Sequence, residues 1–390
     1  MDFTFTEEQQ AATEAAKAVF SGVAPDGVPS PALVPGAVAE DIDRPLWAGL
    51  ASSDLLSLTL SPEHGGAGLD LVALCLVLRE SAKVLARVPL LETCTVAMAL
   101  QRYGNPHLAA ELLPRVGRGE LVLTVGANGR TGHDPAELAV TARRETAAGI
   151  SAGARAGSDG GWVLDGTQSA VPWAQTADWI AIPAHTDEGR AVVALIEPAQ
   201  DGITLAEQIS TSGERFAEVR LESVRVDGHA LIDDAGAWEW LRALLTTGTC
   251  ALALGLGEAV LAMTSQYTGK REQFGFPVAT FQSVAVQTAD RYIDLRAMEV
   301  TLWQAAWRIS TGAAGALPAE GDIAVAKIWA SDGVRRIVQT AQHLHGGFGA
   351  DTDYPLHRFH AWAKQIELSL GPAAAHEEAL GDLLAAHLLG

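Results

Sequence analysis

Phe216-Ala-Glu-Val-Arg-Leu-Glu-Ser-Val-Arg-Val226 alternates apolar and polar side chains for most of its length. This period of two predicts a β-strand with one buried face. Shorter β-rich runs precede it, and turn residues such as Asp165-Gly166 separate them. These runs are Leu121–Thr124, Leu138–Arg143, Trp162–Leu164, Trp179–Ile182 and Ala191–Ile196. Several short strands at close spacing predict a small barrel or sandwich.

On both sides of this β-rich region the pattern becomes helical. The run Leu69–Leu78 and the shorter Asp54-Leu-Leu56 are apolar around most of a turn, which predicts helices buried on most faces. Toward the C-terminus, apolar residues at three- and four-residue steps predict one long amphipathic helix. They are Phe281, Val284, Thr288, Tyr292, Leu295, Met298 and Leu302.

The chain is therefore predicted to be an α+β protein of three domains. An N-terminal α-helical domain covers residues 1–120, a middle β-domain covers 121–232 and a C-terminal α-helical domain covers 233–390. Few folds place a small β-domain between two helical ones. With 390 residues, 48% of them hydrophobic, the chain is large enough to bury cores of this kind.

Charge and composition exclude several classes of function. The formal net charge is -20, from 27 basic and 47 acidic residues, so a polyanion would be repelled and nucleic-acid binding is not expected. No apolar run is long enough to predict a membrane span, and the start of the chain lacks the features of a secretory signal. The three cysteines, Cys75, Cys94 and Cys250, are far apart in apolar surroundings. This pattern predicts buried thiols in a reducing cytoplasm, without disulfides or a metal site.

Three motifs occur in order along the chain. They are Leu60-Ser-Pro-Glu-His-Gly-Gly-Ala-Gly-Leu69, then Arg271-Glu-Gln-Phe-Gly275 with Phe281-Gln282, then Gln342-His-Leu-His-Gly-Gly-Phe-Gly349 with Tyr354-Pro355 and Arg358. Together they resemble the acyl-CoA dehydrogenase family over essentially the whole chain. The resemblance implies an N-terminal helical domain, a small middle β-barrel and a C-terminal four-helix bundle. It also implies an FAD-dependent oxidoreductase that desaturates an acyl-CoA thioester between its α- and β-carbons.

In that family the second and third motifs hold the adenosine and pyrophosphate of an FAD lodged mainly in a neighbouring subunit. The residues that match these motifs are Arg271, Phe274, Gln282, Gln342, Gly346 and Gly347. The chemistry suits the role, because arginine offers a planar charged fork for pyrophosphate and paired glycines let the backbone approach a cofactor. Glutamine side chains can donate to and accept from ribose or adenine.

The family's catalytic base is a carboxylate that removes the α-proton, and here both of its positions hold leucine. Aligning on Lys364 and Gly371 places Leu370 in the commoner position. Counting back 26 residues from Arg271 places Leu245 in the other. Neither side chain can accept a proton.

Other carboxylates could replace the missing base. Glu367 lies about one helical turn before Leu370 and is the best candidate for a relocated base. Glu239 and Glu258 lie near the second position but match neither. For each of the three, a solvated surface position is the ordinary expectation.

The part of the family's site that cradles a chain's own flavin is also eroded. The family's T-E-P-G-x-G-S-D stretch corresponds to Leu123-Thr-Val-Gly-Ala-Asn-Gly129, which lacks the Glu-Pro pair. Its aromatic W-I-T or F-V-T stretch corresponds to Ala170-Val-Pro172. Thr124 remains a candidate hydrogen-bond partner for the flavin, and Trp173 is expected in the core.

This pattern resembles the base-lacking subunit of actinobacterial α2β2 acyl-CoA dehydrogenases, which act on steroid side-chain CoA thioesters in lipid catabolism. The resemblance implies an acyl-CoA substrate, a homologous partner subunit and an electron-transfer flavoprotein as acceptor. Two alternatives stay open. The chain could be a stand-alone or repurposed flavoenzyme with Glu367 as base, or a non-catalytic structural protein on the same fold.

Overall fold

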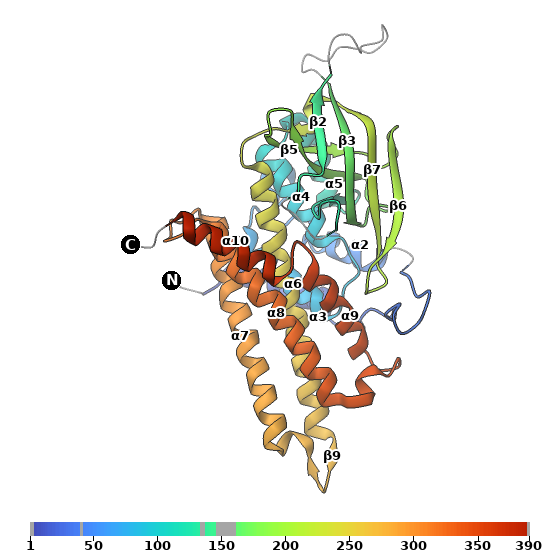
Figure 1. The fold of residues 1–390 in the computed structure, drawn as a ribbon, viewed down its shortest axis with the longest axis vertical. Coiled ribbons are helices and arrows are strands. Elements are labelled where there is room, and N and C mark those ends of the chain that lie inside the picture. Colours follow the sequence, from blue (N-terminus) through green and yellow to red (C-terminus); the bar gives the residue numbers. More distant parts are fainter. Residues whose placement is uncertain (1–3, 40–41, 133–136, 146–160, 388–390) are drawn as a thin grey trace.

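In the computed structural model, residues 4–39, 42–132, 137–145 and 161–387 are described. The N-terminal part is helical, as the sequence predicts (Figure 1). Its elements are α1 (Glu7–Phe20), α2 (Arg44–Ser52), the 3-10 turn η1 (Pro62–His64), α3 (Leu71–Lys83), α4 (Leu90–Tyr103) and α5 (Pro106–Gly117). Helix α3 is buried on most faces, which agrees with its uninterrupted apolar run.

The predicted helix at Asp54-Leu-Leu56 is wrong. Helix α2 ends at Ser52, and Asp54 follows with φ 57°, a left-handed conformation that a helix cannot continue through. Leu55 and Leu56 are still buried, at 1% exposure each. These two leucines are apolar because they pack into the core from a turn, and they do not belong to a helix.

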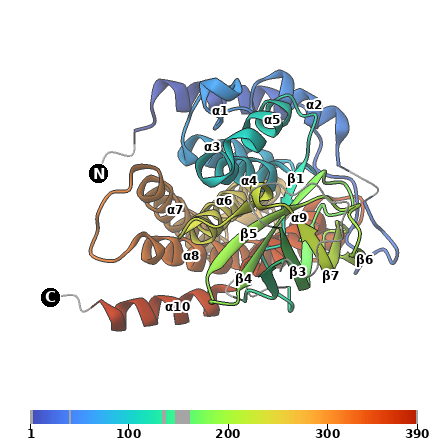
Figure 2. The same ribbon diagram turned by 90° about the horizontal axis from the view of Figure 1, so that it is seen from above.

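The middle β-domain is confirmed as one mixed sheet beside the helices (Figures 1 and 2). Its strands are β1 (Leu123–Val125), β2 (Val140–Arg144), β3 (Trp162–Pro172), β4 (Trp179–Thr186), β5 (Ala191–Ile196), β6 (Ile203–Ile209), β7 (Arg215–Val226) and, after the turn η3 (Gly228–Ala230), β8 (Leu231–Ile232). The strand order is β6-β7-β3-β2-β4-β5-β8, and β1 pairs with β4. Within the described residues the end strands β6 and β8 do not pair with each other.

Strand β7 shows why the sequence alternates only for part of its length. Ala217, Val219 and Leu221 are buried, whereas the next buried residue is Val224, three positions on. The pairing of β7 with β3 shifts register at this point, and Ser223 has φ 52°. A bulge therefore resets the period and keeps the second half of the strand facing the core.

The C-terminal part is a helical bundle with one small hairpin. Its elements are α6 (Ala237–Lys270), the hairpin strands β9 (Glu272–Gln273) and β10 (Phe276–Pro277), the turn η4 (Val278–Thr280), α7 (Gln282–Thr311), α8 (Ala319–His345), the turn η5 (Gly346–Ala350), α9 (Leu356–Leu368) and α10 (Ala373–Ala386). Helix α6 packs against α3, α4, α7, α8 and α9, and Figure 2 shows it at the centre of the protein.

Helix α6 is long and apolar enough to cross a membrane by length and composition alone. However, 78% of its most apolar window is buried within the protein. A helix surrounded by other helices needs apolar side chains on all faces, so burial accounts for its composition.

Helix α6 approaches α3 closely at Gly255. A Cβ atom at this position would lie 1.9 Å from the Arg79 carbonyl oxygen. Gly255→Ala is therefore expected to lower the free energy of unfolding by about 1–3 kcal/mol through overpacking. Thermal or urea unfolding measures the change. Gly269→Ala is the matched control in the same helix, because a Cβ there meets nothing within 4 Å; equal destabilisation by both changes would contradict the packing argument.

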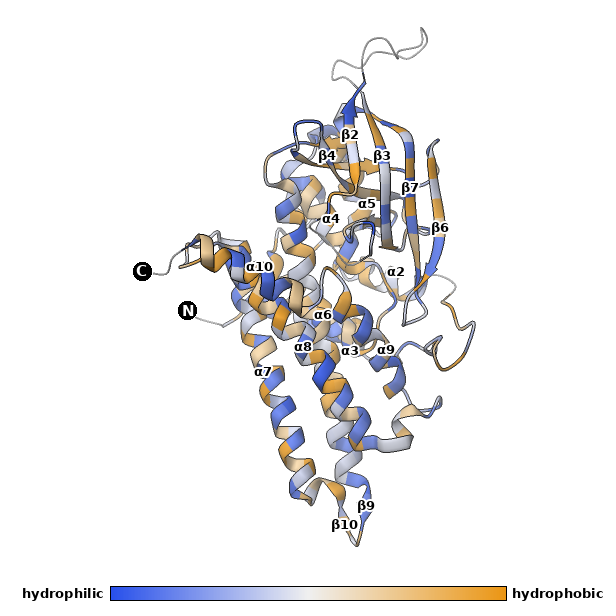
Figure 3. Cartoon of the chain, viewed as in Figure 1, coloured by the Kyte–Doolittle hydropathy of each residue, from blue (hydrophilic) through white to orange (hydrophobic). Residues whose placement is uncertain are grey.

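The long amphipathic stripe is only partly covered by this chain. Leu295, Met298 and Leu302 are buried, as predicted, but Phe281 and Tyr292 are 36% and 57% exposed. Most of the exposed large apolar residues at this end of the bundle lie in the hairpin and the first turns of α7 (Figure 3). They are Phe274, Phe276, Phe281, Val286, Tyr292 and Ile293. So many large apolar side chains in one region are typical of a protein interface.

Candidate functional site

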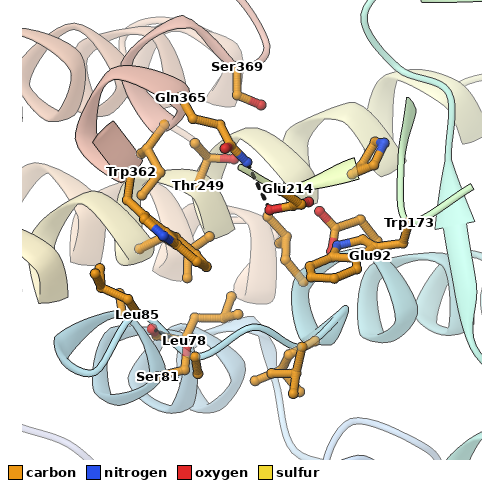
Figure 4. A pocket seen from close by; sticks show the side chains of 18 of the residues that line it. Leu78, Ser81, Leu85, Glu92, Trp173, Glu214, Thr249, Trp362, Gln365 and Ser369 are labelled. Carbon is orange, nitrogen blue, oxygen red and sulfur yellow. Dashed lines mark hydrogen bonds between the residues drawn. The ribbon is translucent and has the colours of Figure 1, made fainter. Parts of the chain in front are cut away.

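A cavity of about 90 Å³ lies where the three parts of the chain meet (Figure 4). Helices α3, α4, α6 and α9, the loop between α3 and α4, and the β-domain all contribute to its wall. Its lining is mainly apolar and includes the aromatic side chains of Phe216, Trp173 and Trp362. An enclosed apolar space with a few polar groups is the usual form of a small-molecule site.

Two carboxyl side chains face this cavity from different domains. Glu92 comes from α4, and Glu214 comes from the turn that precedes β7. Burial, together with the nearby Glu214, raises the pKa of Glu92 to about 8, against hydrogen bonds from its own backbone and from Trp173. Burial likewise raises the pKa of Glu214 to about 7, although Arg87 and Gln365 oppose the change. Near neutral pH the pair therefore holds at least one proton.

Arg87 fixes the surroundings of Glu214. Its guanidinium forms an ion pair with Asp26, and its Nη2 donates to the Ser212 carbonyl at 3.1 Å. Glu214 itself accepts a hydrogen bond from Gln365 Nε2 at 3.1 Å. These contacts link the loop between α3 and α4, the turn before β7, and α9 behind the cavity.

Backbone strain gathers around the same cavity. Leu85, Ala170 and Trp173 all line it, and each has positive φ, at 51°, 50° and 58°. Leu370, with φ 57°, follows the lining residue Ser369. Such conformations cost on the order of 1–3 kcal/mol each and concentrate at functional sites. The strain marks this region independently of the carboxyl pair.

The two leucines in the predicted base positions do not line this cavity. Leu370 lines a separate groove between α6, α8 and α10, and its backbone N–H donates to Asn128 Oδ1 at 3.1 Å. Leu245 is buried within α6 at 2% exposure. Neither position brings a proton acceptor into the cavity.

The carboxylates weighed as substitutes also lie elsewhere. Glu367 pairs with Lys364 at 2.9 Å and with Arg335 at 3.7 Å. Glu258 forms ion pairs with Arg79 and Lys83, and Glu239 is exposed beside the groove at α10. None of these three glutamates lines the cavity.

The residues predicted to hold FAD gather at the far end of the bundle. Arg271 ends α6 and Gln282 begins α7, with the exposed Phe274 in the hairpin between them. The Tyr267 ring, one turn before Arg271, stacks on His345 at the end of α8, with ring centroids 4.3 Å apart. This contact brings the second motif, which contains Arg271, beside the third, which contains Gln342, Gly346 and Gly347.

This end of the bundle has the features of a cofactor clasp. Gly346 has φ 61°, and a Cβ at Gly346 or Gly347 would meet nothing within 4 Å. Gln342 Nε2 donates to the Gly346 carbonyl at 2.9 Å and so holds the turn in place. No residue in the described part of the chain pairs with the exposed Arg271 guanidinium. Open glycines and an unpaired arginine fit the pyrophosphate half of FAD.

Thr124 lies far from this clasp, in the β-domain. Its side chain is fully buried, and its hydroxyl donates to the Pro172 carbonyl at 2.7 Å. The next residue, Trp173, is 7% exposed and turns its indole into the cavity beside Glu92 (Figure 4). These residues belong to the stretch that corresponds to the family's flavin cradle, and their side chains already have contacts within the chain. This region therefore does not fit an isoalloxazine ring, whereas the clasp does fit a pyrophosphate.

Comparison with known proteins identifies the family. The profile of the acyl-CoA dehydrogenase N-terminal domain matches residues 6–120, and that of the C-terminal domain matches residues 245–384. The acyl-CoA dehydrogenase FadE27 of Mycobacterium tuberculosis is 33% identical over 348 residues, 88% of each chain. The chain belongs to the acyl-CoA dehydrogenase family. It is thus an oxidoreductase by family, with the helical, β and helical domains that the fold shows.

Solved structures of other acyl-CoA dehydrogenases share the whole architecture. The ChsE4-ChsE5 complex from Mycobacterium tuberculosis superposes with a TM-score of 0.86 at 33% identity, covering 99% of both chains. A Tcur3481-Tcur3483 steroid acyl-CoA dehydrogenase variant superposes with a TM-score of 0.85 at 34% identity, covering 97% of this chain and 98% of the other. Each structure is named after two different proteins, and ChsE4-ChsE5 is named as a complex.

Sequence reasoning missed Glu92 and Glu214 as residues of this acyl-CoA dehydrogenase's cavity. One signal was present, because Glu92 is the single charged residue in the apolar stretch Val88–Leu100. A glutamate that stands alone in an apolar stretch is more often buried than a glutamate in a polar stretch. Glu214 lies in a polar turn, Ser210–Arg215, and gave no comparable signal.

Proposed function

We propose that this chain is the subunit of a heteromeric, FAD-dependent acyl-CoA dehydrogenase that clasps a shared FAD but does not remove the substrate's α-proton. The observation that carries this proposal is the contrast between two parts of one chain. The clasp around Arg271 and Gly346 is open and intact, whereas both base positions hold leucine.

The proposal assigns the chain's residues distinct tasks. Bound FAD supplies the hydride acceptor. Arg271 binds its pyrophosphate, Gln282 and Gln342 orient the adenosine part, and Gly346 and Gly347 leave room for it. The partner subunit supplies the carboxylate that takes the α-proton. Thr124 could contact a flavin only after releasing the Pro172 carbonyl.

Two features support a partner subunit. The exposed aromatic hairpin and the uncovered start of α7 form an apolar surface beside the clasp. In addition, ChsE4-ChsE5, which is named as a complex, covers nearly the full length of this chain. By the same family resemblance, we propose a steroid side-chain CoA thioester as substrate and an electron-transfer flavoprotein as electron acceptor, in the cytoplasm.

Co-expression with a homologous partner tests the proposal. The chain alone is expected to be colourless and inactive, and the complex is expected to carry about one flavin per pair of subunits and to desaturate acyl-CoA. Absorbance and a dye-reduction assay measure the two properties.

The control is a complex whose partner carries glutamine in place of its base glutamate. This complex should bind FAD and lack turnover. Full flavin content together with turnover in the isolated chain would refute the heteromeric proposal and favour an autonomous enzyme.

A further inference from the structure

Helix α10 is apolar, yet the chain leaves it largely uncovered. Its sequence, Ala373–Ala386, consists mainly of alanine and leucine, and none of its residues is buried. Within the described residues it packs chiefly against α8, and Figure 2 shows it at the edge of the bundle. A helix of this length is marginal in water on its own, because most helical stability comes from packing an apolar face. Helix α10 therefore presents a face that lacks most of its packing partner.

That face borders the groove of about 630 Å³ between α6, α8 and α10. Ala375, Ala379 and Leu383 line the groove at four-residue steps along α10. The opposite wall is also mainly apolar and includes Ala243, Ile323, Ala324 and Leu370. Small residues at four-residue steps leave a channel along a helix, into which a ridge of side chains from another helix can pack.

The rim of this groove is acidic. Its carboxylates are Glu239, Glu320, Glu378 and Asp382. None of the four forms an ion pair within the part of the chain that the structure describes. His376 also lines the groove, but burial lowers the pKa of His376 to about 4, so it is uncharged near neutral pH. Among the described lining residues Arg242 is then the one cation, and the rim attracts positive charge.

Two hydrogen-bond donors on α6 face the groove without a partner. Thr246 is 3% exposed, and its hydroxyl makes no hydrogen bond to any described residue. Arg242 lies one turn earlier, and the same holds for its guanidinium. Because buried polar groups are normally hydrogen-bonded, these donors point to acceptors supplied from outside the chain. The end of an α-helix offers such acceptors, since its last four carbonyls have no partner within the helix and carry the negative end of the helix dipole.

We propose that the groove beside α10 docks a basic amphipathic helix of a separate partner protein. The apolar face of the docked helix packs against α10 and the opposite wall, and its lysines or arginines lie at the acidic rim. Its last carbonyls accept hydrogen bonds from Arg242 and Thr246. Binding of an amphipathic helix in an apolar groove is a recurring mode of protein recognition. An acidic helix would be repelled by the rim.

The position of the groove assigns it to a protein other than the homologous subunit. Arg242 and Arg271 are 29 positions apart on α6, about 44 Å at 1.5 Å per residue. The groove therefore lies toward the opposite end of α6 from the clasp and the exposed aromatic hairpin, which form the proposed surface for that subunit. None of the clasp residues lines the groove, so the docking is separate from the proposed function.

A synthetic helix tests the docking. The probe is a fluorescein-labelled, C-terminally amidated peptide of leucine and lysine, about as long as α10, with its leucines on one helical face. One comparison peptide carries glutamate in place of each lysine, and another has the same composition without an apolar face. Fluorescence anisotropy measures binding to the chain alone and to its complex with the homologous subunit. The lysine peptide is expected to bind both at least about tenfold tighter than either comparison peptide.

Charge reversals locate the binding. Glu378→Lys/Asp382→Lys should weaken binding of the lysine peptide about tenfold, because attractive charge pairs become repulsive. Glu111→Lys/Glu222→Lys makes the same change of net charge at exposed carboxylates on α5 and β7, and it should leave the affinity nearly unchanged. Thermal unfolding checks that both variants fold.

Arg242 separates docking from general attraction between a basic peptide and an acidic protein. Arg242→Ala makes the chain more negative, so general attraction alone would raise the affinity for the lysine peptide. Docking predicts a loss of about tenfold, since the terminal carbonyls of the peptide lose a charged donor. Thr246→Val removes the hydroxyl with little change of shape and should lower the affinity by a smaller factor.

Three results would overturn the proposal. The first is equal binding of the lysine peptide and either comparison peptide. The second is a higher affinity in Arg242→Ala, with equal losses in the two charge-reversal variants. The third is binding to the chain alone that disappears in the complex, which would show that the homologous subunit covers the groove. All three are binding results, whereas the proposed function fails on flavin content and turnover.

Discussion

Replacing Arg271 with alanine is expected to weaken FAD binding by the assembled complex at least about a hundredfold and to abolish desaturation at ordinary FAD concentrations. Two charge-assisted hydrogen bonds at about 1.5–3 kcal/mol each would be lost from the pyrophosphate. Nothing in the described part of the chain pairs with this guanidinium, so its removal should leave the chain's own stability nearly unchanged. Flavin release on dilution measures the affinity, and thermal unfolding of the chain checks its stability.

Two comparison variants sharpen this test. Arg271→Lys keeps the charge but loses the planar fork, so an intermediate loss of FAD is expected. Arg118→Ala removes an exposed arginine that pairs with Glu120 at the end of α5, and it should leave FAD bound. If the Arg271→Ala complex kept its flavin and its turnover, the clasp would be assigned to the wrong residues.

Replacing Lys327 with alanine is expected to destabilise the chain by about 2–5 kcal/mol, the range for truncating a long buried side chain to alanine. The side chain is fully buried in α8. Its Nζ donates to Ser331 Oγ at 2.9 Å and to the Ile366 and Glu367 carbonyls at 3.2 and 3.1 Å. Without the ammonium, the carbonyls at the end of α9 lose their partner and a cavity remains.

The pH dependence of stability gives a second readout for Lys327. Burial lowers the pKa of Lys327 from 10.5 to about 8, so between these values the folded chain binds fewer protons than the unfolded chain. Stability from this group therefore rises with pH across that window. Lys327→Ala should lack this rise. A variant with wild-type unfolding and the same pH slope would show that the lysine does not hold α9.

Local patterns made the larger elements predictable. The apolar run Ala191–Ile196 coincides with β5, since a buried strand flanked by turns needs no information from elsewhere in the chain. Strand β6, Ile203–Ile209, was missed because its burial is partial and irregular. It lies at the edge of the sheet and, among the described strands, pairs with β7 alone, so its sequence keeps no clear period of two.

The site was less predictable than the fold, for a physical reason. Arg271 and Gly346 could be found because each lies in a contiguous motif. Glu92 and Glu214 are 122 positions apart in sequence, on elements of different domains, and only tertiary packing brings them together. The unusual pKa of each depends on that packing, which no local pattern records.

Helix α6 has one more consequence. Its turns near Thr249 line the cavity, and its end at Arg271 belongs to the clasp. The 22 residues between them span about 33 Å at 1.5 Å each. Substitutions this far apart usually act independently of each other. After duplication of an ancestral gene, one copy could therefore lose its proton acceptor while selection through its sister subunit preserved the clasp, and a symmetric enzyme could become an asymmetric one in single-residue steps.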